Sequence, residues 1–286
     1  MDATSTLVGE PATLSNDAFE FVRTLIHQQA AIVLEPTKAY LVEARLGSLA
    51  RKAGASSVDA FLRHARAQRI GPVHQEIVEA MTTNETLFFR DAPAFNAIRL
   101  AIVPGLIRRR QDRRTLNIWS AASSTGQEPY SVAMILRECF PELQSWDIRM
   151  FGTDISRDVL EAAKRGEFSQ SEVNRGLPAA LLVKYFRQVG TRWVIREDIR
   201  EMVTFLPCNL AAEWPALPQF DVILLRNVLI YFDLDTKRSI LAKVVRSMAR
   251  DGTLLLGNGE TTMNLDSGFE RMTYDKAVYY KPKRLE

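Results

Sequence analysis

The spacing of hydrophobic residues changes near residue 115, and this change limits the possible fold more than any other sequence feature. From Leu14 to about Thr82, apolar residues recur at helical spacing without an alternating run. After Thr115, short apolar runs alternate with amphipathic stretches, a pattern typical of a parallel sheet with helical crossovers. The sequence therefore predicts an α/β protein: an all-helical N-terminal domain followed by a doubly wound sheet domain.

The first part is expected to hold helices over residues 15–30, 36–53, 57–68 and 72–81, with Ser15 or Asp17 as the first cap. Their spacing predicts a small bundle joined by short loops. The expected buried faces of the first two helices are Phe19, Val22, Leu25 and Ile26, then Val42, Leu46, Leu49 and Ala53.

The second part is expected to hold strands over residues 115–120, 147–153, 202–207, 220–225, 252–258, 269–274 and 277–281. Helices are expected over 128–139, 156–165 and 235–249. Only Asp275 and Lys276 separate the last two strands, which predicts a terminal antiparallel hairpin. Residues 166–201 break the alternation and predict a small inserted β subdomain with a short helix over 178–186.

Charge and composition exclude several classes of protein. The net charge of +3 is too small for a chain that coats nucleic acid. The cysteines, Cys139 and Cys208, cannot form a disulfide framework or a cysteine-rich metal site, and they suit a reducing cytoplasm. No apolar run approaches the ~20 residues that span a bilayer. Residues 1–10 carry no basic residue, unlike a secretory signal. We expect a cytoplasmic protein that does not insert into membranes.

Polar residues follow the predicted strands at the sheet edge where open α/β folds bind ligands. Small residues from Ala121 onward follow the first strand and allow a ligand close to the backbone, although an ordinary tight turn is an equal alternative. Asp154 ends the second strand, where its carboxylate could accept hydrogen bonds from the hydroxyls of a ribose. The alternative for Asp154 is a cap of the following helix.

The third and fourth strands end in Asn209-Leu210 and in Arg226-Asn227. An asparagine beside free backbone groups could bind the edges of an adenine ring. Burying a guanidinium without partners costs several kcal/mol, so Arg226 is difficult to explain as core. We expect these strand ends to face one crevice.

The segment before the sheet also carries polar side chains. Asn84 and Thr86 offer short hydrogen-bonding groups, and Arg90 offers a planar fork suited to a carboxylate. The alternative is a polar linker between domains, with Phe88 and Phe89 packed inward.

Taken together, TTNxTxFFR at 82–90, WSAASSTGxEPYS at 119–131, Asp154, and RNVxIYF at 226–232 form a specific combination. In this order they resemble the CheR-type chemoreceptor methyltransferases, and the resemblance runs from Leu14 to Tyr280. It implies a helical receptor-docking domain and linker over 14–90. It also implies a Rossmann-like class I methyltransferase domain over 91–286, with an inserted β subdomain at 166–201.

The resemblance implies S-adenosylmethionine as methyl donor, S-adenosylhomocysteine as product, no metal, and glutamates on chemoreceptor cytoplasmic helices as acceptors in chemotaxis adaptation. Glu128 is included in the site on the resemblance alone. Its alternative role is to stabilise a helix, because a carboxylate is favourable in the first helical turn. The implied cofactor site comprises Asn84, Thr86, Arg90, Ala121, Glu128, Asp154, Asn209, Leu210, Arg226 and Asn227.

The expected mechanism needs no general base, because a glutamate carboxylate is already ionised at pH 7. The enzyme must chiefly align acceptor and methyl for in-line transfer in a dry site. Arg90 and Tyr231 are the residues we expect to orient the acceptor carboxylate.

Receptor helices are acidic, and residues 38–69 hold seven basic residues against two acidic ones. Lys38, Arg45 and Lys52 recur every seven positions and form one stripe, whereas Arg51 points about 100° from Arg45. The resemblance favours Arg45 and Arg51 as receptor contacts, and a solvated helix face is the alternative. Lys38 and Lys52 are expected to contribute.

The hairpin around Gly190 is short, whereas family members that bind a C-terminal receptor pentapeptide carry a longer, glycine-richer loop there. We therefore expect a monomer that needs no such tether and is recruited to membrane receptor arrays.

Other functions compete with this reading. An NAD-dependent oxidoreductase would also use Asp154, but the chain lacks G-x-G-x-x-G and a histidine at any predicted strand end. A nucleic-acid methyltransferase would carry Asn/Asp-Pro-Pro-aromatic where this chain has Asn227-Val228-Leu229-Ile230. A catalytically silent S-adenosylmethionine-binding regulator of a receptor array would have the same cofactor residues.

Overall fold

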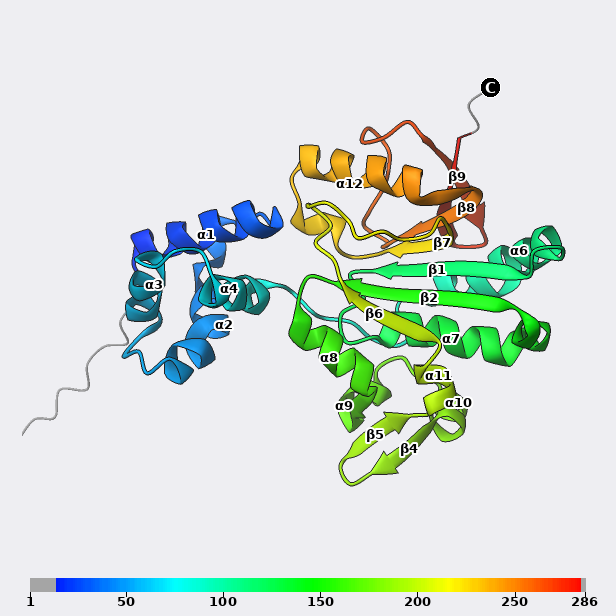
Figure 1. Ribbon diagram of the computed structural model, residues 1–286, viewed down its shortest axis with the longest axis horizontal. Helices are drawn as coiled ribbons and strands as arrows, with labels where there is room; N and C mark the ends of the chain where they lie inside the picture. The colour runs from blue at the N-terminus through cyan, green and yellow to red at the C-terminus, as the bar shows by residue number, and fades with distance from the viewer. Residues whose placement is uncertain (1–13, 284–286) are drawn as a thin grey trace, which may run out of the picture. The chain divides into compact units, whose positions relative to one another are not determined.

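The computed structural model describes residues 14–283, which form two compact units divided between Thr82 and Thr83 (Figure 1). The expectation for residues 1–10 lies outside this range. Within residues 14–283, no helix has the length and apolar character needed to cross a bilayer.

The first unit is all-helical, as predicted. It comprises α1 (Asn16–Ala30), the 3-10 turn η1 (Pro36–Lys38), α2 (Ala39–Lys52), α3 (Val58–Arg66) and α4 (Pro72–Met81). The Ser15 hydroxyl accepts a hydrogen bond from the Ala18 N–H, so Ser15 caps α1 and the alternative cap Asp17 is wrong. The predicted buried face of α1 is confirmed.

The predicted buried face of α2 is partly wrong. Val42 and Leu46 are buried as expected, but the row continues to Ala50. Leu49 is half-buried, and Ala53 is exposed because the helix has already ended at Lys52. The steps of four residues from Val42 to Ala50 follow one side of a helix.

The second unit contains a seven-stranded sheet in the order β6-β2-β1-β7-β8-β10-β9. The strands are β1 (Thr115–Ala121), β2 (Asp147–Asp154), β6 (Val203–Pro207), β7 (Phe220–Leu225), β8 (Met248–Leu256), β9 (Phe269–Tyr274) and β10 (Ala277–Pro282). Neighbours from β6 to β8 are parallel, and β9 and β10 form the predicted antiparallel hairpin. The strand order reverses between β1 and β7, which is the topological switch point of a doubly wound sheet.

Helices cover this sheet at the expected places: α7 (Gln127–Cys139), α8 (Arg157–Arg165) and α12 (Leu234–Ser247), with the 3-10 turn η3 (Pro141–Ser145). A helical stretch before β1 was not predicted: α5 (Ala92–Ala97), the π-helical turn η2 (Ile98–Ile102) and α6 (Val103–Arg110). In Figure 1, α12 lies on one side of the β7 and β8 ribbons and α7 lies on the other side of the sheet.

Strand β8 begins at Met248, four residues before the predicted Gly252, so the predicted helix over 235–249 is too long. Arg250 and Asp251 lie between the predicted helix over 235–249 and the predicted strand over 252–258. In the structure, the Asp251 carboxylate binds Arg109 and Arg110 of α6, which lie about 140 positions earlier in the chain. A contact this distant leaves no periodic signal.

The predicted small antiparallel subdomain is present as a sheet in the order β3-β5-β4, formed by β3 (Glu167–Ser169), β4 (Phe186–Val189) and β5 (Arg192–Ile195). It is accompanied by α9 (Gln170–Asn174), α10 (Ala179–Tyr185) and α11 (Glu197–Arg200). The ring of Phe88 packs edge-on against Phe168 and Phe186, with centroids 5.0 and 5.7 Å apart. The segment after Thr83 is thus anchored to the small sheet. Phe88 is buried, as the alternative of a polar linker expected, whereas Phe89 is only half-buried.

Candidate active site

The predicted cofactor residues lie in the second unit, at the carboxyl ends of β1, β2, β6 and β7, in the first turn of α7 and in the segment 83–91. Hydrogen bonds connect most of these segments to one another. The structure therefore brings together the groups that the sequence placed at strand ends.

The turn after β1 has an unusual backbone. Ala122 and Ser124 have positive φ angles of 60° and 49°, and Gly126 has 93°. Non-glycine residues adopt this region uncommonly, so the surrounding structure must hold the turn in place. A Cβ on Gly126 would lie 2.9 Å from the Tyr130 ring, which leaves room for glycine alone. This turn is more constrained than an ordinary tight turn.

Asp154 supplies part of that constraint. Its Oδ2 accepts the Ser124 N–H at 2.9 Å, and its Oδ1 accepts the Ser156 N–H at 3.0 Å. The N-cap position of α8 belongs to Ser156, so Asp154 is not simply the helix cap. The buried carboxylate joins the turns after β1 and β2 and fixes a negative charge at the sheet edge.

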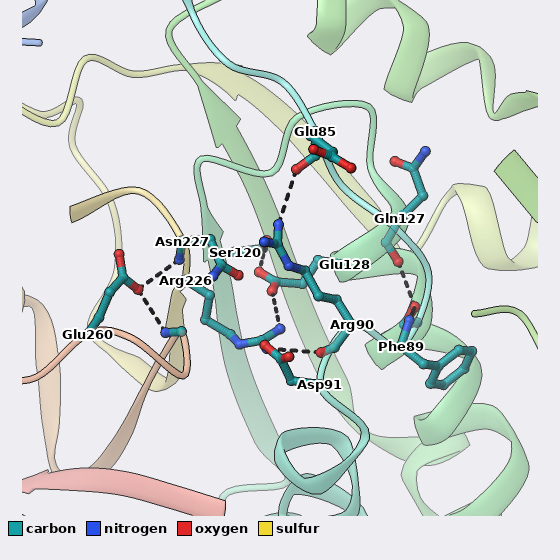
Figure 2. Close-up of polar contacts among 12 residues, drawn as sticks. Glu85, Phe89, Arg90, Asp91, Ser120, Gln127, Glu128, Arg226, Asn227 and Glu260 are labelled. Carbon is teal, nitrogen blue, oxygen red and sulfur yellow. Dashed lines mark hydrogen bonds and ion pairs between the residues drawn. The ribbon is translucent and has the colours of Figure 1, made fainter. Parts of the chain in front are cut away.

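Arg226 lies at the centre of an ion-pair network, and its side chain is only 1% exposed. Its Nη1 donates to Glu128 Oε2 at 2.9 Å, and its Nη2 donates to Asp91 Oδ2 at 2.6 Å (Figure 2). Ser120 Oγ donates to the other Glu128 oxygen at 2.8 Å. Charge-assisted bonds of this kind fix orientation, so Arg226 and Ser120 hold the Glu128 carboxylate in one position. Asp91 has a place in this network that sequence reasoning missed, although it directly follows the quoted Arg90 motif.

The segment 83–91 is bound to the same region. Ser124 Oγ donates to the Asn84 carbonyl at 2.7 Å. Arg226 Nη2 donates to the Arg90 carbonyl at 2.9 Å, and Arg90 Nη1 donates to the Glu85 carbonyl at 3.2 Å. Thr86 is half-buried, and its hydroxyl has no hydrogen-bond partner among the described residues. Arg90 is half-buried as a residue, and its guanidinium keeps further N–H groups that can bind an anion.

Asn209 and Leu210 follow β6 as predicted. Asn209 Oδ1 accepts the Ala211 N–H at 3.0 Å, so this side chain shapes its own turn. The Leu210 side chain is buried, and its carbonyl accepts hydrogen bonds from Trp214 and Lys243. Burial raises the pKa of the neighbouring Cys208 thiol to about 11, so this thiol stays protonated at neutral pH. Cys208 is thus no candidate nucleophile.

The loop after β7 carries Asn227, with a φ of 58°, and Tyr231 at the end of η4 (Leu229–Tyr231). Tyr231 is half-buried, and its phenol has no hydrogen-bond partner among the described residues. The carboxylate of Glu260 accepts the N–H groups of Asn227 and Val228 at 2.7 and 2.9 Å. Sequence reasoning missed Glu260, although it follows β8 as the other candidates follow their strands.

The predicted docking residues lie in the first unit, on and just before α2, and we call Lys38, Arg45, Arg51 and Lys52 the α2 basic patch. Lys38, Arg51 and Lys52 are exposed. Arg45 is half-buried, because its Nη1 donates to the carbonyls of Met81 and Thr82 at 2.6 and 3.1 Å. Arg45 therefore holds the C-terminal end of α4 in place.

The two acidic residues of the 38–69 stretch bind the start of α1. Glu43 accepts the Leu14 N–H, and Asp59 accepts the Ser15 N–H. Hydrogen bonds from Ser15 are the main cause of a lowered pKa for Asp59.

Comparison with known proteins identifies the family. The family described as "CheR methyltransferase, SAM binding domain" matches residues 84–278, and "CheR methyltransferase, all-alpha domain" matches residues 17–82. The chain belongs to the CheR methyltransferase family. The family prediction is confirmed, as is the fold of a helical domain followed by a Rossmann-like methyltransferase domain.

Curated relatives cover nearly the whole chain. "Chemotaxis protein methyltransferase 1" of Pseudomonas aeruginosa is 36% identical over 94% of this chain and 99% of its own. "Chemotaxis protein methyltransferase" of Vibrio anguillarum is 35% identical over 95% and 98%, and that of Borreliella burgdorferi is 30% identical over 94% and 95%. This CheR protein is thus a methyltransferase of chemotaxis with an S-adenosylmethionine-binding domain, which removes the oxidoreductase and nucleic-acid methyltransferase alternatives.

Proposed function

We propose that this CheR protein methylates glutamate side chains on chemoreceptor cytoplasmic helices and forms glutamyl methyl esters. Family membership supports methyl transfer in chemotaxis. The observation that carries the site is the pair of fixed carboxylates: Glu128, which pairs with Arg226 beside the β1/β7 switch point, and Asp154 at the end of the neighbouring strand β2. We also propose that the protein is a cytoplasmic monomer that is recruited to membrane receptor arrays and does not bind nucleic acid.

The residues present fit S-adenosylmethionine in charge. The Glu128 carboxylate, oriented by Arg226, would bind a positive charge of the cofactor, and Asp154 would accept its ribose hydroxyls. Asn209 and Leu210 would contact the adenine. When bound, the cofactor supplies a methyl group on a positively charged sulfur, which is already electrophilic. The proposed cofactor site retains Asn84, Thr86, Arg90, Ala121, Arg226 and Asn227, with Arg226 acting through Glu128.

The chain's own contribution to transfer is orientation. A glutamate acceptor is ionised at pH 7, so the enzyme needs no general base. The Arg90 guanidinium would bind the acceptor carboxylate, and the Tyr231 phenol would donate a hydrogen bond to it. Holding two reactants in reactive geometry can supply much of the rate enhancement.

The α2 basic patch is the proposed receptor-docking surface, because exposed cations attract an acidic helix. Arg51, Lys38 and Lys52 would make the direct contacts, and Arg45 would both support α4 and contribute charge. The alternative of a merely solvated face predicts that these charges do not affect methylation of the receptor.

We also propose that docking does not need a receptor C-terminal tether. Strands β4 and β5 pair up to Val189 and Arg192, so only Gly190 and Thr191 form the turn. This turn is short for gripping a peptide. Titration with a receptor-terminal pentapeptide should show no binding at micromolar concentration, and micromolar affinity would overturn tether independence.

The deciding experiment incubates the full chain with receptor-containing membranes and S-adenosylmethionine labelled in the methyl group. The proposed function predicts label on the receptor that mild base releases as methanol, because methyl esters hydrolyse readily. Receptors with alanine at the candidate glutamates provide the matched control. A silent regulator would bind the cofactor with the same residues but leave the wild-type receptor unlabelled.

A further inference from the structure

Glu260 binds two loops at the edge of the candidate site. Its Oε2 accepts the N–H group of Asn227 at 2.7 Å (Figure 2) and that of Gly257 at 2.8 Å. Its Oε1 accepts the N–H group of Val228 at 2.9 Å. A longer bond of 3.4 Å comes from the Ile230 N–H. One carboxylate therefore connects the loop after β7 to the loop after β8.

The contact is close enough to restrict the residues around it. A Cβ on Gly257 would lie 2.6 Å from Asn227 Nδ2 and 2.8 Å from Glu260 Oε2, so this position requires glycine. Asn227 itself has a φ of 58°, a region that non-glycine residues adopt uncommonly. Such a conformation persists when neighbouring groups over-determine it, and the Glu260 carboxylate is one of those groups.

The loop that Glu260 binds carries residues with proposed roles in methyl transfer. Asn227 belongs to the proposed cofactor site, and Tyr231 belongs to the proposed acceptor site. Residues 229–231 form the short turn η4, which follows directly after the bound N–H groups. The position of the Tyr231 phenol therefore depends on the loop that the carboxylate fixes. Both carboxylate oxygens of Glu260 already accept hydrogen bonds from backbone N–H groups. Glu260 is therefore suited to positioning the loop rather than to contacting the acceptor.

We infer that Glu260 is a positioning residue for methyl transfer, which acts by holding the 226–231 loop in its reactive shape. This role rests on the proposed function. It predicts that loss of Glu260 lowers kcat far more than cofactor affinity, because Glu128, Asp154 and Asn209 hold the proposed cofactor from other strands.

The test compares Glu260→Gln, Glu260→Ala and a matched control, Glu270→Gln. Glutamine keeps one acceptor oxygen and can bind part of the N–H set, whereas alanine binds none. Glu270 is exposed on β9, and its side chain makes no hydrogen bond or ion pair with any residue of the described range 14–283. Each full-length variant is assayed for methyl transfer to receptor membranes, for cofactor affinity and for Tm. Amide hydrogen exchange at Asn227, Val228 and Gly257 reports the loop without any receptor.

The assays are run at a temperature well below each variant's Tm. We expect kcat to fall roughly threefold in Glu260→Gln and at least about tenfold in Glu260→Ala. Cofactor affinity stays within about threefold, exchange at the bound amides accelerates in the same order, and Glu270→Gln matches the wild type. A kcat within about twofold of wild type in both Glu260 variants would overturn the positioning role. A loss of cofactor affinity equal to the loss of kcat would also overturn it.

A wild-type chain that labels no receptor would overturn the proposed function and this role with it. Rapid wild-type labelling with unchanged kcat in the Glu260 variants would overturn the positioning role alone.

Discussion

The Arg226 guanidinium lies 2.9 Å from the Glu128 carboxylate, and this ion pair joins the end of β7 to the first turn of α7. Asp91 binds the same guanidinium at 2.6 Å and so attaches the segment 83–91. Buried ion pairs add little net stability over an apolar pair, but breaking one leaves an uncompensated charge. We interpret the network as the device that keeps Glu128 oriented toward the cofactor site.

Replacing Arg226 with lysine should therefore impair both folding and cofactor binding. A lysine keeps the charge but cannot bind Glu128, Asp91 and the Arg90 carbonyl together through a planar fork. We expect a loss of about 2 to 4 kcal/mol in unfolding free energy and about tenfold weaker S-adenosylmethionine binding. Urea unfolding followed by tryptophan fluorescence measures the unfolding free energy of the second unit, because all four tryptophans lie there. Calorimetric titration measures the affinity for S-adenosylmethionine.

The matched control for that prediction is Arg238→Ala. Arg238 pairs with Asp235 one helical turn away, and both side chains are at least half exposed. Such surface pairs are worth about 0.5 kcal/mol or less, so stability and cofactor binding should stay near wild type. Equal behaviour of Arg226→Lys and Arg238→Ala would contradict the role assigned to the Arg226 network.

The sequence predicted much of this fold because local periodicity carries the signal. Helix α4 was predicted over its full range, Pro72–Met81, since proline marks its start and the apolar spacing persists to its end. The ends of the strands also predicted the place of the site, because a polar residue directly after an apolar run lies at the carboxyl edge of the sheet.

Partners distant in sequence could not be predicted. Arg226 and Glu128 are 98 positions apart, and Glu260 binds N–H groups about 30 positions earlier. Arg226 was singled out as a buried cation that needed partners, yet no spacing rule names those partners. Glu260 was missed because its donors are backbone groups, which every residue carries.

Arg90→Ala should lower methyl transfer without unfolding the protein. Arg90 is half-buried, and within the described part of the chain its side chain makes one hydrogen bond, from Nη1 to the Glu85 carbonyl. Removing the proposed acceptor ligand should reduce kcat/KM for receptor methylation by about tenfold or more, while urea unfolding changes by less than about 1 kcal/mol. Arg90→Lys should recover part of the rate. Turnover near wild type in Arg90→Ala would remove this residue from the mechanism.

Arg51→Ala should separate docking from folding in the α2 basic patch. Arg51 is exposed, so its loss should raise the KM for receptor several-fold at low salt and leave Tm and cofactor affinity unchanged. Salt should raise the wild-type KM as well, because it screens exposed charges. Arg45→Ala should instead lower the Tm of the helical unit, since its guanidinium binds the Met81 and Thr82 carbonyls.

The control for docking is Arg23→Ala, an exposed arginine on α1 paired with Glu20. Its loss should not alter the KM for receptor. A KM that is unchanged in Arg51→Ala, or raised equally in Arg23→Ala, would favour a solvated face over a docking surface.

The stability of the second unit should fall in acid through Asp251. Hydrogen bonds from Arg110, followed by those from Arg109, lower the pKa of Asp251 from 3.8 to about 2. A carboxyl with a lowered folded-state pKa stabilises the fold above its unfolded pKa, and this contribution disappears as pH falls from about 4 toward 2. Its full size is at most about 2 kcal/mol, because the side chain is 30% exposed.

Asp251→Asn should therefore lose about 1 to 2 kcal/mol of unfolding free energy at pH 7, and its difference from wild type should shrink by roughly half at pH 3. Urea unfolding followed by tryptophan fluorescence at both pH values measures this difference. Asp147→Asn removes a more exposed pair with Arg149 and should cost about 0.5 kcal/mol or less at pH 7. A difference between Asp251→Asn and wild type that is the same at pH 7 and pH 3 would show that the ion pair with Arg110 does not govern the acid sensitivity.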